Sequence, residues 1–351
     1  MHQQARFLTT ADGLSLAWAQ AGRGMPLVKA SNWLTHLRYD WESPVWRHWT
    51  EFFAGHFRYI RYDERGCGMT DWEVGDLSFP RWVEDLESVV RSAHVEQPFI
   101  LVGISQGAAT AIAYAERYPQ QVSHLVLYGG YARGAIKRGD ADSKHLYEAM
   151  EELARQGWGK DNPVFRQVFT SRFIPDGTEE QIGWFNDLCR KATTAKIGAE
   201  LLGVRAEINV ADLLPRIRTP TLVLHARDDE VVPFAEGKLL ASKIPGATFV
   251  ELESRNHVLL EHEPAWAHFK ESVLDFVGLG GGYEKMHEVL SCRESEILTL
   301  LCRGCTNIQI ACELGIAEKT VRNHLSRLYE KMGVRSRAEA IVQARNGDSF
   351  R

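Results

Sequence analysis

The sequence of 351 residues predicts an α/β fold, a doubly wound and mostly parallel sheet with a helical cap, followed by a small all-α domain. Two observations predict the sheet and its cap. Short apolar runs alternate with helical periodicity along residues 1–277, and an aromatic-rich stretch interrupts this alternation at 131–218. A third observation, a glycine-rich stretch before a purely helical C-terminal segment, predicts the second domain. Strands that alternate with helices are typical of a parallel sheet covered on both faces.

The expected strands are short apolar runs bounded by glycine, proline or charged residues, as in buried parallel strands. Helical periodicity marks residues 80–95 and 106–118. The stretch 131–218 is too long for a simple connection and is rich in helix formers, so we expect it to form the cap. The six expected strands are 26–30, 57–62, 98–103, 124–129, 220–225 and 247–252.

Glycines at 278 and 280–282 predict a flexible linker over residues 278–284, between domains at 1–277 and 285–351. The whole chain has a formal net charge of −5, which taken alone argues against a nucleic-acid partner. Divided after residue 283, that charge becomes −7 for the first part and +2 for the second. The acidic average therefore hides a mildly basic tail.

No apolar run reaches the ~18 residues that a membrane span needs, and the start has no basic-then-apolar signal sequence. Six cysteines are too few for a disulfide scaffold. We therefore expect a cytoplasmic protein with reduced thiols and no membrane partner. Cys302 and Cys305 have C-x-x-C spacing, but core packing is the better interpretation, and the histidines show no metal spacing. We expect no metal and no cofactor.

The segment Gly103-Ile104-Ser105-Gln106-Gly107 lies between an expected strand and an expected helix. Its small flanking residues allow a tight turn that exposes a serine nucleophile. A serine hydroxyl needs a base and an orienting carboxylate, in the chain order Ser, Asp, His for such a fold. Asp228 and Asp229 follow the strand 220–225, and His257 follows the strand 247–252.

With these motifs, residues 5–277 resemble the α/β-hydrolase superfamily. The resemblance implies Ser105 as nucleophile, His257 as general base and Asp229, rather than Asp228, as the orienting acid. The family's usual His-Gly after the early strand is replaced here by Ser31-Asn32-Trp33. The backbone N–H groups of Trp33 and Gln106 are then the expected oxyanion hole. Whether this site turns over a substrate is left open by the sequence.

Residues 287–344 have the pattern of helices joined by short turns. Ser291 and Thr306 are expected to cap two helices, Gly304 ends the first of these, and Gly315 lies in the turn before a third. Helix, glycine-containing turn, helix is the helix-turn-helix arrangement. On the third helix, apolar residues share one face and hydrogen-bond donors another. The apolar residues are Val321, Leu325, Leu328 and Met332, and the donors are Lys319, Arg322, Asn323, Arg327 and Lys331.

The matches across this segment, among them Leu290-Ser291, Thr306-Asn307 and Thr320-Val321, resemble the LuxR-type DNA-binding domain. The resemblance implies that DNA is approached by Lys319, Thr320, Arg322, Asn323 and Arg327, and that Thr306 and Asn307 anchor its backbone. LuxR-type domains read paired half-sites, so a homodimer is expected.

Together these features predict a transcription regulator that binds operator DNA and senses a small effector, apolar or ester-like, in its hydrolase-like domain. An esterase or lactonase with a secondary DNA-binding tail is the alternative. A third hypothesis combines them, in a receptor that slowly hydrolyses its effector.

Overall fold

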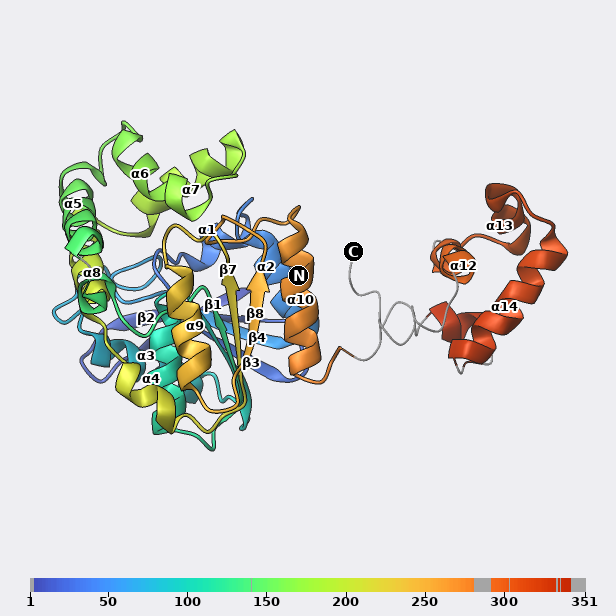
Figure 1. Ribbon diagram of the computed structural model, residues 1–351, viewed down its shortest axis with the longest axis horizontal. Helices are drawn as coiled ribbons and strands as arrows, with labels where there is room; N and C mark the ends of the chain where they lie inside the picture. Colours follow the sequence, from blue (N-terminus) through green and yellow to red (C-terminus); the bar gives the residue numbers. More distant parts are fainter. Residues whose placement is uncertain are drawn as a thin grey trace. The chain divides into compact units, whose positions relative to one another are not determined.

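The computed structural model describes residues 3–139, 141–280, 292–302, 304–332, 334 and 336–341. The chain forms two compact units, residues 1–270 and 271–351, and each unit is described by itself (Figure 1). Residues 281–284 of the expected linker lie outside the described residues. Among the described helices, none combines the length and the apolar character needed to cross a membrane.

An eight-stranded sheet with the order β1-β2-β4-β3-β5-β6-β7-β8 forms the core of the first unit. The strands from β4 to β8 in this order pair in parallel, whereas β2 is antiparallel to both β1 and β4. The predicted fold class is confirmed. The strands are β1 (Gln4–Thr9), β2 (Ser15–Ala21), β3 (Pro26–Ala30), β4 (Arg58–Tyr62), β5 (Phe99–Ile104), β6 (Val122–Tyr128), β7 (Thr221–Ala226) and β8 (Thr248–Leu252).

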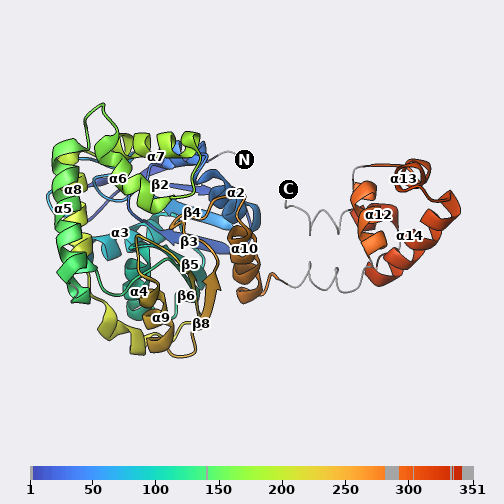
Figure 2. The same ribbon diagram turned by 45° about the horizontal axis from the view of Figure 1, so that its top comes forward.

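Helices cover both faces of this sheet (Figure 2). One face carries α3 (Phe79–Ser92), α4 (Gly107–Arg117) and α9 (Phe234–Lys243), and the other carries α2 (Arg47–His56) and α10 (Pro264–Phe276). The short helix α1 (Leu37–Trp41) precedes α2. Aromatic rings join α2 to α10, since the Trp49 ring lies 4.6 Å from that of Trp266 and 4.7 Å from that of Phe269.

A group of helices lies between β6 and β7, in the stretch 131–218 for which the sequence predicts a cap. Trp158 of this stretch is buried against the loop after β3. Its ring stacks on that of Trp33, with 5.6 Å between the ring centroids. The cap therefore packs directly on the loop that the sequence assigns to the oxyanion hole. It comprises α5 (Ala141–Gly157), α6 (Val164–Phe173), α7 (Glu179–Ala192) and α8 (Ala195–Glu207), flanked by the 3-10 helices η1 (Ala135–Arg138) and η2 (Ala211–Arg216).

The second unit contains α12 (Cys292–Cys302), α13 (Asn307–Leu314) and α14 (Glu318–Met332). Its own core buries apolar side chains from all three, including Leu301, Ile310 and Val321. Thr306 caps α13 in a reciprocal capping box with Gln309, and Gly315 ends it at a φ of +64°. The predicted capping residue Ser291 lies outside the described residues. A small all-α helix-turn-helix domain is confirmed.

Candidate functional site

Ser105 occupies the tight turn between β5 and α4, with a φ of +54°. Non-glycine residues rarely adopt this left-handed conformation, and such strain is concentrated at functional turns. The flanking glycines permit close approach. A Cβ on Gly103 would lie 2.6 Å from the Ala108 Cα, and one on Gly107 would lie 2.8 Å from the Ser31 carbonyl oxygen. The G-x-S-x-G spacing thus places Ser105 at the carboxyl end of the central strand.

Asp229 and His257 meet beyond the carboxyl ends of β7 and β8. His257 Nδ1 hydrogen-bonds Asp229 Oδ2 at 2.7 Å, while Asp229 Oδ1 accepts the backbone N–H groups of Val231 and Val232. Burial by itself raises the pKa of Asp229, but the charge and hydrogen bond of His257 hold it below its ordinary value. The ionised carboxylate therefore fixes the imidazole with Nε2 as the nitrogen available for a proton. The neighbouring Asp228 is exposed.

Ser105 is not hydrogen-bonded to this pair. In the part of the chain that the structure describes, His257 Nε2 is buried and has no hydrogen-bond partner. The ring of Phe173 packs edge-on against His257 at 5.2 Å, and Phe173 and Ser105 line the same cavity. The structure therefore joins the acid and the base directly and places the serine beside them in one cavity, without the third hydrogen bond.

The expected oxyanion hole is already occupied by a side chain. The backbone N–H of Trp33 donates to Gln106 Oε1 at 2.7 Å. The Gln106 amide in turn donates through Nε2 to the Ser31 carbonyl and to Glu64 Oε1, both at 3.1 Å. A substrate carbonyl would have to displace Gln106 Oε1 before it reached the Trp33 N–H.

A buried ion pair extends this network into the cap. Glu64 Oε2, in the loop after β4, accepts a hydrogen bond from Arg205 of α8, and each side chain is 3% exposed. Burial raises the pKa of Glu64, and Arg205 opposes that shift. The Arg205 guanidinium also lies over the rings of Trp33 and Trp82, at 5.0 and 5.5 Å. Polar contacts from Trp33 through Gln106 and Glu64 to Arg205 thus connect the oxyanion loop, the nucleophile turn and the cap.

The cavity beside Ser105 has a volume of about 40 Å³ in this conformation. That space admits water but not a larger molecule, so a ligand requires outward movement of the cap. Its described lining is largely apolar, with several polar groups. The lining residues are Trp33, Ser105, Gln106, Tyr131, Ala135, Arg138, Tyr147, Met150, Arg172, Phe173, Leu202, Arg205, Val231 and Val232.

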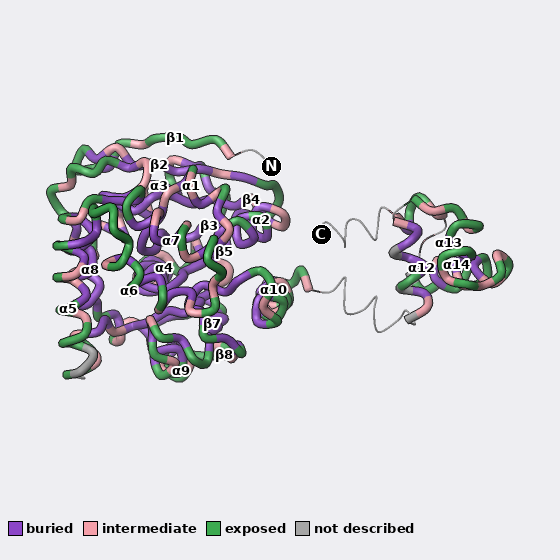
Figure 3. The backbone as a smooth tube through the Cα atoms, turned by 90° about the horizontal axis from the view of Figure 1, so that it is seen from above, coloured by how far each residue is buried: buried purple, intermediate pink, exposed green. Residues whose placement is uncertain are grey.

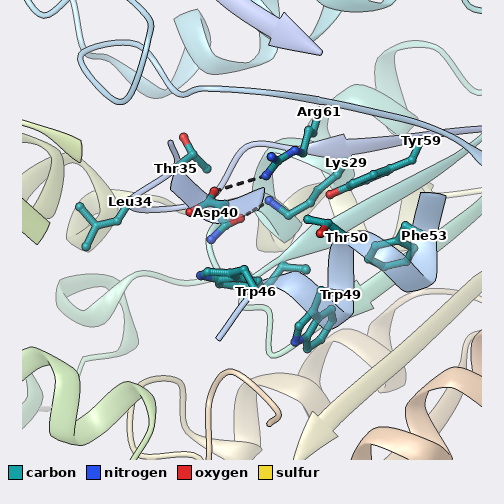
Figure 4. Close-up of a pocket in the computed structure, with 12 residues that line it drawn as sticks. Lys29, Leu34, Thr35, Asp40, Trp46, Trp49, Thr50, Phe53, Tyr59 and Arg61 are labelled. Atoms are coloured by element: carbon teal, nitrogen blue, oxygen red, sulfur yellow. Dashed lines mark hydrogen bonds and ion pairs between the residues drawn. The ribbon is translucent and has the colours of Figure 1, made fainter. Parts of the chain in front are cut away.

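A second cavity, of about 10 Å³, lies beside β3, β4 and α2 and contains buried charges (Figure 4). Lys29 donates to Asn32 Oδ1, and Arg61 lies 3.4 Å from Asp40. Burial lowers the pKa of Lys29 to about 8 and raises that of Asp40 to about 6. The space holds at most a water molecule. The hydrogen bond from Lys29 connects this cluster to the oxyanion loop, since Asn32 precedes Trp33.

The residues expected to approach DNA lie along α14, mostly in its N-terminal half. Their side chains are exposed, apart from the half-buried Thr320. Arg322 lies 3.9 Å from Glu318. Because both side chains are exposed, this ion pair is weak and leaves Arg322 able to contact a phosphate. The exposed residues are Lys319, Arg322, Asn323 and Arg327.

Thr306 and Asn307 stand at the start of α13 and already have partners. Thr306 Oγ1 accepts the Gln309 N–H at 3.3 Å, and Asn307 Oδ1 accepts a hydrogen bond from Arg337 at 3.1 Å. Cys302 and Cys305 pack against the apolar core of this unit. Within the described residues, no three His, Cys, Asp or Glu side chains gather in a way that would hold a metal ion.

With this geometry in view, two family matches define the class of the protein. Residues 47–265, more than half of the chain, match the family described as serine aminopeptidase, S33. The chain belongs to this α/β-hydrolase family. Residues 288–344 match the bacterial regulatory proteins of the luxR family. The fusion of the two regions is that of a DNA-binding regulator.

Individual relatives include a hydrolase superfamily protein and a probable transcriptional regulator. The AB hydrolase superfamily protein YisY of Bacillus subtilis is 26% identical over 265 residues, which cover 72% of this chain and 91% of that protein. The probable transcriptional regulatory protein SgaR of Hyphomicrobium methylovorum is 30% identical over 191 residues, 52% of this chain and 87% of that protein. An esterase from Exiguobacterium antarcticum superposes with a TM-score of 0.65 at 22% identity, over 78% of this chain and 100% of that chain. This last similarity establishes the fold alone.

The sequence interpretation did not single out the polar groups around the cavity. Arg205 interrupts the apolar run LLGVRA of α8, and an arginine inside such a run is a signal of a buried charge. Glu64 lies between Asp63 and Arg65, a run of charged residues that gives no sign of burial. Arg138 and Arg172 carry no comparable signal, because their local sequences are those of ordinary exposed positions.

Proposed function

We propose that this protein is a ligand-responsive transcription regulator. In this proposal the hydrolase-like domain binds a small molecule beneath its cap, and occupancy changes the affinity of the helix-turn-helix domain for operator DNA. The protein acts in the cytoplasm as a homodimer, because LuxR-type domains read paired half-sites.

The hydrogen bond from the Trp33 N–H to Gln106 Oε1 is the observation that supports sensing over turnover. A pocket with a nucleophile, a base and an acid, but with an oxyanion donor already satisfied, favours binding over transition-state stabilisation. Fused to a DNA-binding domain, such a pocket serves as a receptor.

The DNA-binding half of the proposal is tested by selection of duplexes from a randomised library with the full-length chain. We expect the wild type to enrich a sequence with two related half-sites. A variant that combines Arg322→Ala with Asn323→Ala is expected to enrich none, since both side chains are exposed on α14. Lys243→Ala, an exposed change on α9, is the matched control and retains selection. If the double variant enriches the same sequence as the wild type, α14 is not the reading helix.

The second candidate function is a serine hydrolase, favoured by the strained Ser105 turn and the Asp229–His257 hydrogen bond. Its test is turnover of p-nitrophenyl acetate by the wild type against Ser105→Ala. Sustained hydrolysis that disappears in the variant supports the enzyme. Equal rates for both proteins remove it.

A further inference from the structure

Three arginine side chains enter the cavity beside Ser105 from three separate segments of the cap. Arg138 comes from η1, Arg172 from α6 and Arg205 from α8. None of the described residues that line this cavity is an aspartate or a glutamate. The charged side chains that line this cavity are therefore all cationic, although Arg205 is paired with Glu64 behind the lining, and the overall charge of the protein is negative.

Arg138 and Arg172 have no carboxylate partner among the described residues. Arg172 donates to the Glu230 backbone carbonyl and lies 2.9 Å from the Met150 sulfur. Arg138 Nε donates to the Arg133 backbone carbonyl at 3.0 Å. Burial lowers the pKa of Arg172, although Tyr147 and the carboxylates of Asp229 and Glu230 oppose that shift. Two guanidinium groups thus line a partly enclosed space, and no carboxylate among the described residues lies within ion-pair distance of either.

Arg205 lines the same cavity and has donors that are not satisfied. One of its nitrogens pairs with Glu64, but Nε and Nη1 are buried and have no hydrogen-bond partner within the described part of the chain. The side chain is 3% exposed, so water does not readily satisfy these donors. Unsatisfied buried donors on a charged group are unfavourable, and an acceptor placed beside them would remove that penalty.

The remainder of the lining is a phenol and apolar surface. Tyr147 is influenced by all three arginines, yet burial still raises its pKa, so its hydroxyl remains a hydrogen-bond donor at neutral pH. Phe173, Leu202 and Val232 supply an apolar wall. Such a combination fits a molecule with one anionic end and one apolar end.

We propose that the cavity binds a carboxylic acid with an aliphatic or aromatic body, its carboxylate held by Arg138, Arg172 and Arg205. Guanidinium groups match the planar carboxylate and bind it through paired hydrogen bonds. The acid enters when the cap segments that carry Tyr147 and Arg172 move outward. This assignment rests on the proposed sensing function, and it narrows the apolar or ester-like effector expected from the sequence to an acid with an apolar body.

The test uses the full-length chain and two probe pairs, 3-phenylpropanoate and octanoate, each with its primary amide. Calorimetry or ligand-observed NMR gives the affinities. We expect each acid to bind at least tenfold more tightly than its amide, which has the same body without the charge. Arg172→Gln is expected to weaken acid binding at least tenfold and to leave amide binding unchanged. Arg155→Gln, on the outer surface of α5, is the matched control and binds acid as the wild type does.

Arg138→Gln provides a second variant if Arg172→Gln fails to fold. The proposal is overturned if neither acid binds, if amides bind as tightly as acids, or if both folded variants keep the acid affinity. Operator affinity, measured on the same preparations, distinguishes the two proposals. If the acid binds but operator affinity does not change, the acid site is supported and the proposed regulation of DNA binding is contradicted. If operator affinity changes with methyl 3-phenylpropanoate but no acid binds, the acid site is contradicted and the proposed regulation of DNA binding is supported.

Discussion

At the nucleophile, the side chain of Gln106 accepts the Trp33 N–H that a reacting carbonyl or phosphonyl oxygen requires. Gln106→Ala is therefore expected to increase the rate at which a fluorophosphonate labels Ser105 at least tenfold, since a single oxyanion donor contributes roughly 10²–10³ in rate. Intact-protein mass spectrometry over time measures the labelling. Ser105→Ala is the control that remains unmodified. Equal or slower labelling of Gln106→Ala would show that Gln106 does not block the donor.

Lys29 provides a pH-dependent test of the buried cluster next to the oxyanion loop. Its pKa is lowered by burial to about 8, from an ordinary 10.5. Between these two pH values the unfolded chain binds more protons at this residue than the folded chain, so stability rises with pH. We expect the free energy of unfolding of the wild type to increase relative to Lys29→Met over this window, by at most about 1.4 kcal/mol per pH unit.

Urea unfolding at several pH values across the window measures this difference. Lys243→Met, which changes an exposed lysine, is the control and shows no such trend. A difference between wild type and Lys29→Met that stays constant across the window would mean that Lys29 is charged throughout in the folded protein.

The sequence predicts the reacting groups far better than their surroundings. Ser105, Asp229 and His257 are recognisable because each follows a strand in a fixed order, and the last two meet at 2.7 Å. The Gln106–Trp33 hydrogen bond joins residues that are 73 positions apart and depends on the rotamer of Gln106. No local sequence pattern encodes either condition. Arg138, Arg172 and Arg205 were not predicted as cavity residues for a related reason. Whether they line one cavity depends on how the cap helices pack.

At the level of elements, an apolar run bounded by turns is what makes a strand predictable. The six parallel strands lie within two residues of their predicted ranges, because each is an apolar run bounded by turns. The hairpin of β1 and β2 was not predicted. β1 is largely exposed, with Phe7 at 56%, and so lacks the apolar run of a buried strand (Figure 3). It is one of the two edge strands of the sheet, where such a pattern is usual.

The exposed residues of helix α14 are predicted to determine DNA affinity. Arg322→Ala is expected to weaken binding to the selected duplex by about 1–3 kcal/mol if it reads a base, or to reduce the salt slope by about 1 if it contacts a phosphate. Fluorescence anisotropy over a range of salt concentrations distinguishes the two roles. Glu313→Ala, an exposed change on α13, is the control. Unchanged affinity at every salt concentration would place Arg322 outside the DNA interface.

Over the whole molecule, the charge is divided between an acidic hydrolase-like region and a mildly basic DNA-binding domain. The two regions account for the two family matches. Regulation requires that occupancy of one unit changes the binding free energy of the other, and such coupling is reciprocal between the two ligands. In the proposed mechanism the input is a ligand that moves the cap, since the cavity of about 40 Å³ is too small for one in this conformation.

The most direct test of the regulator account is the dissociation constant for the selected operator before and after a fluorophosphonate occupies the cavity through Ser105. Full-length wild type, modified to completion, is compared with Ser105→Ala treated in the same way. We predict at least a fivefold change in the dissociation constant for the wild type and none for the variant. An identical dissociation constant for modified and unmodified wild type would contradict the account.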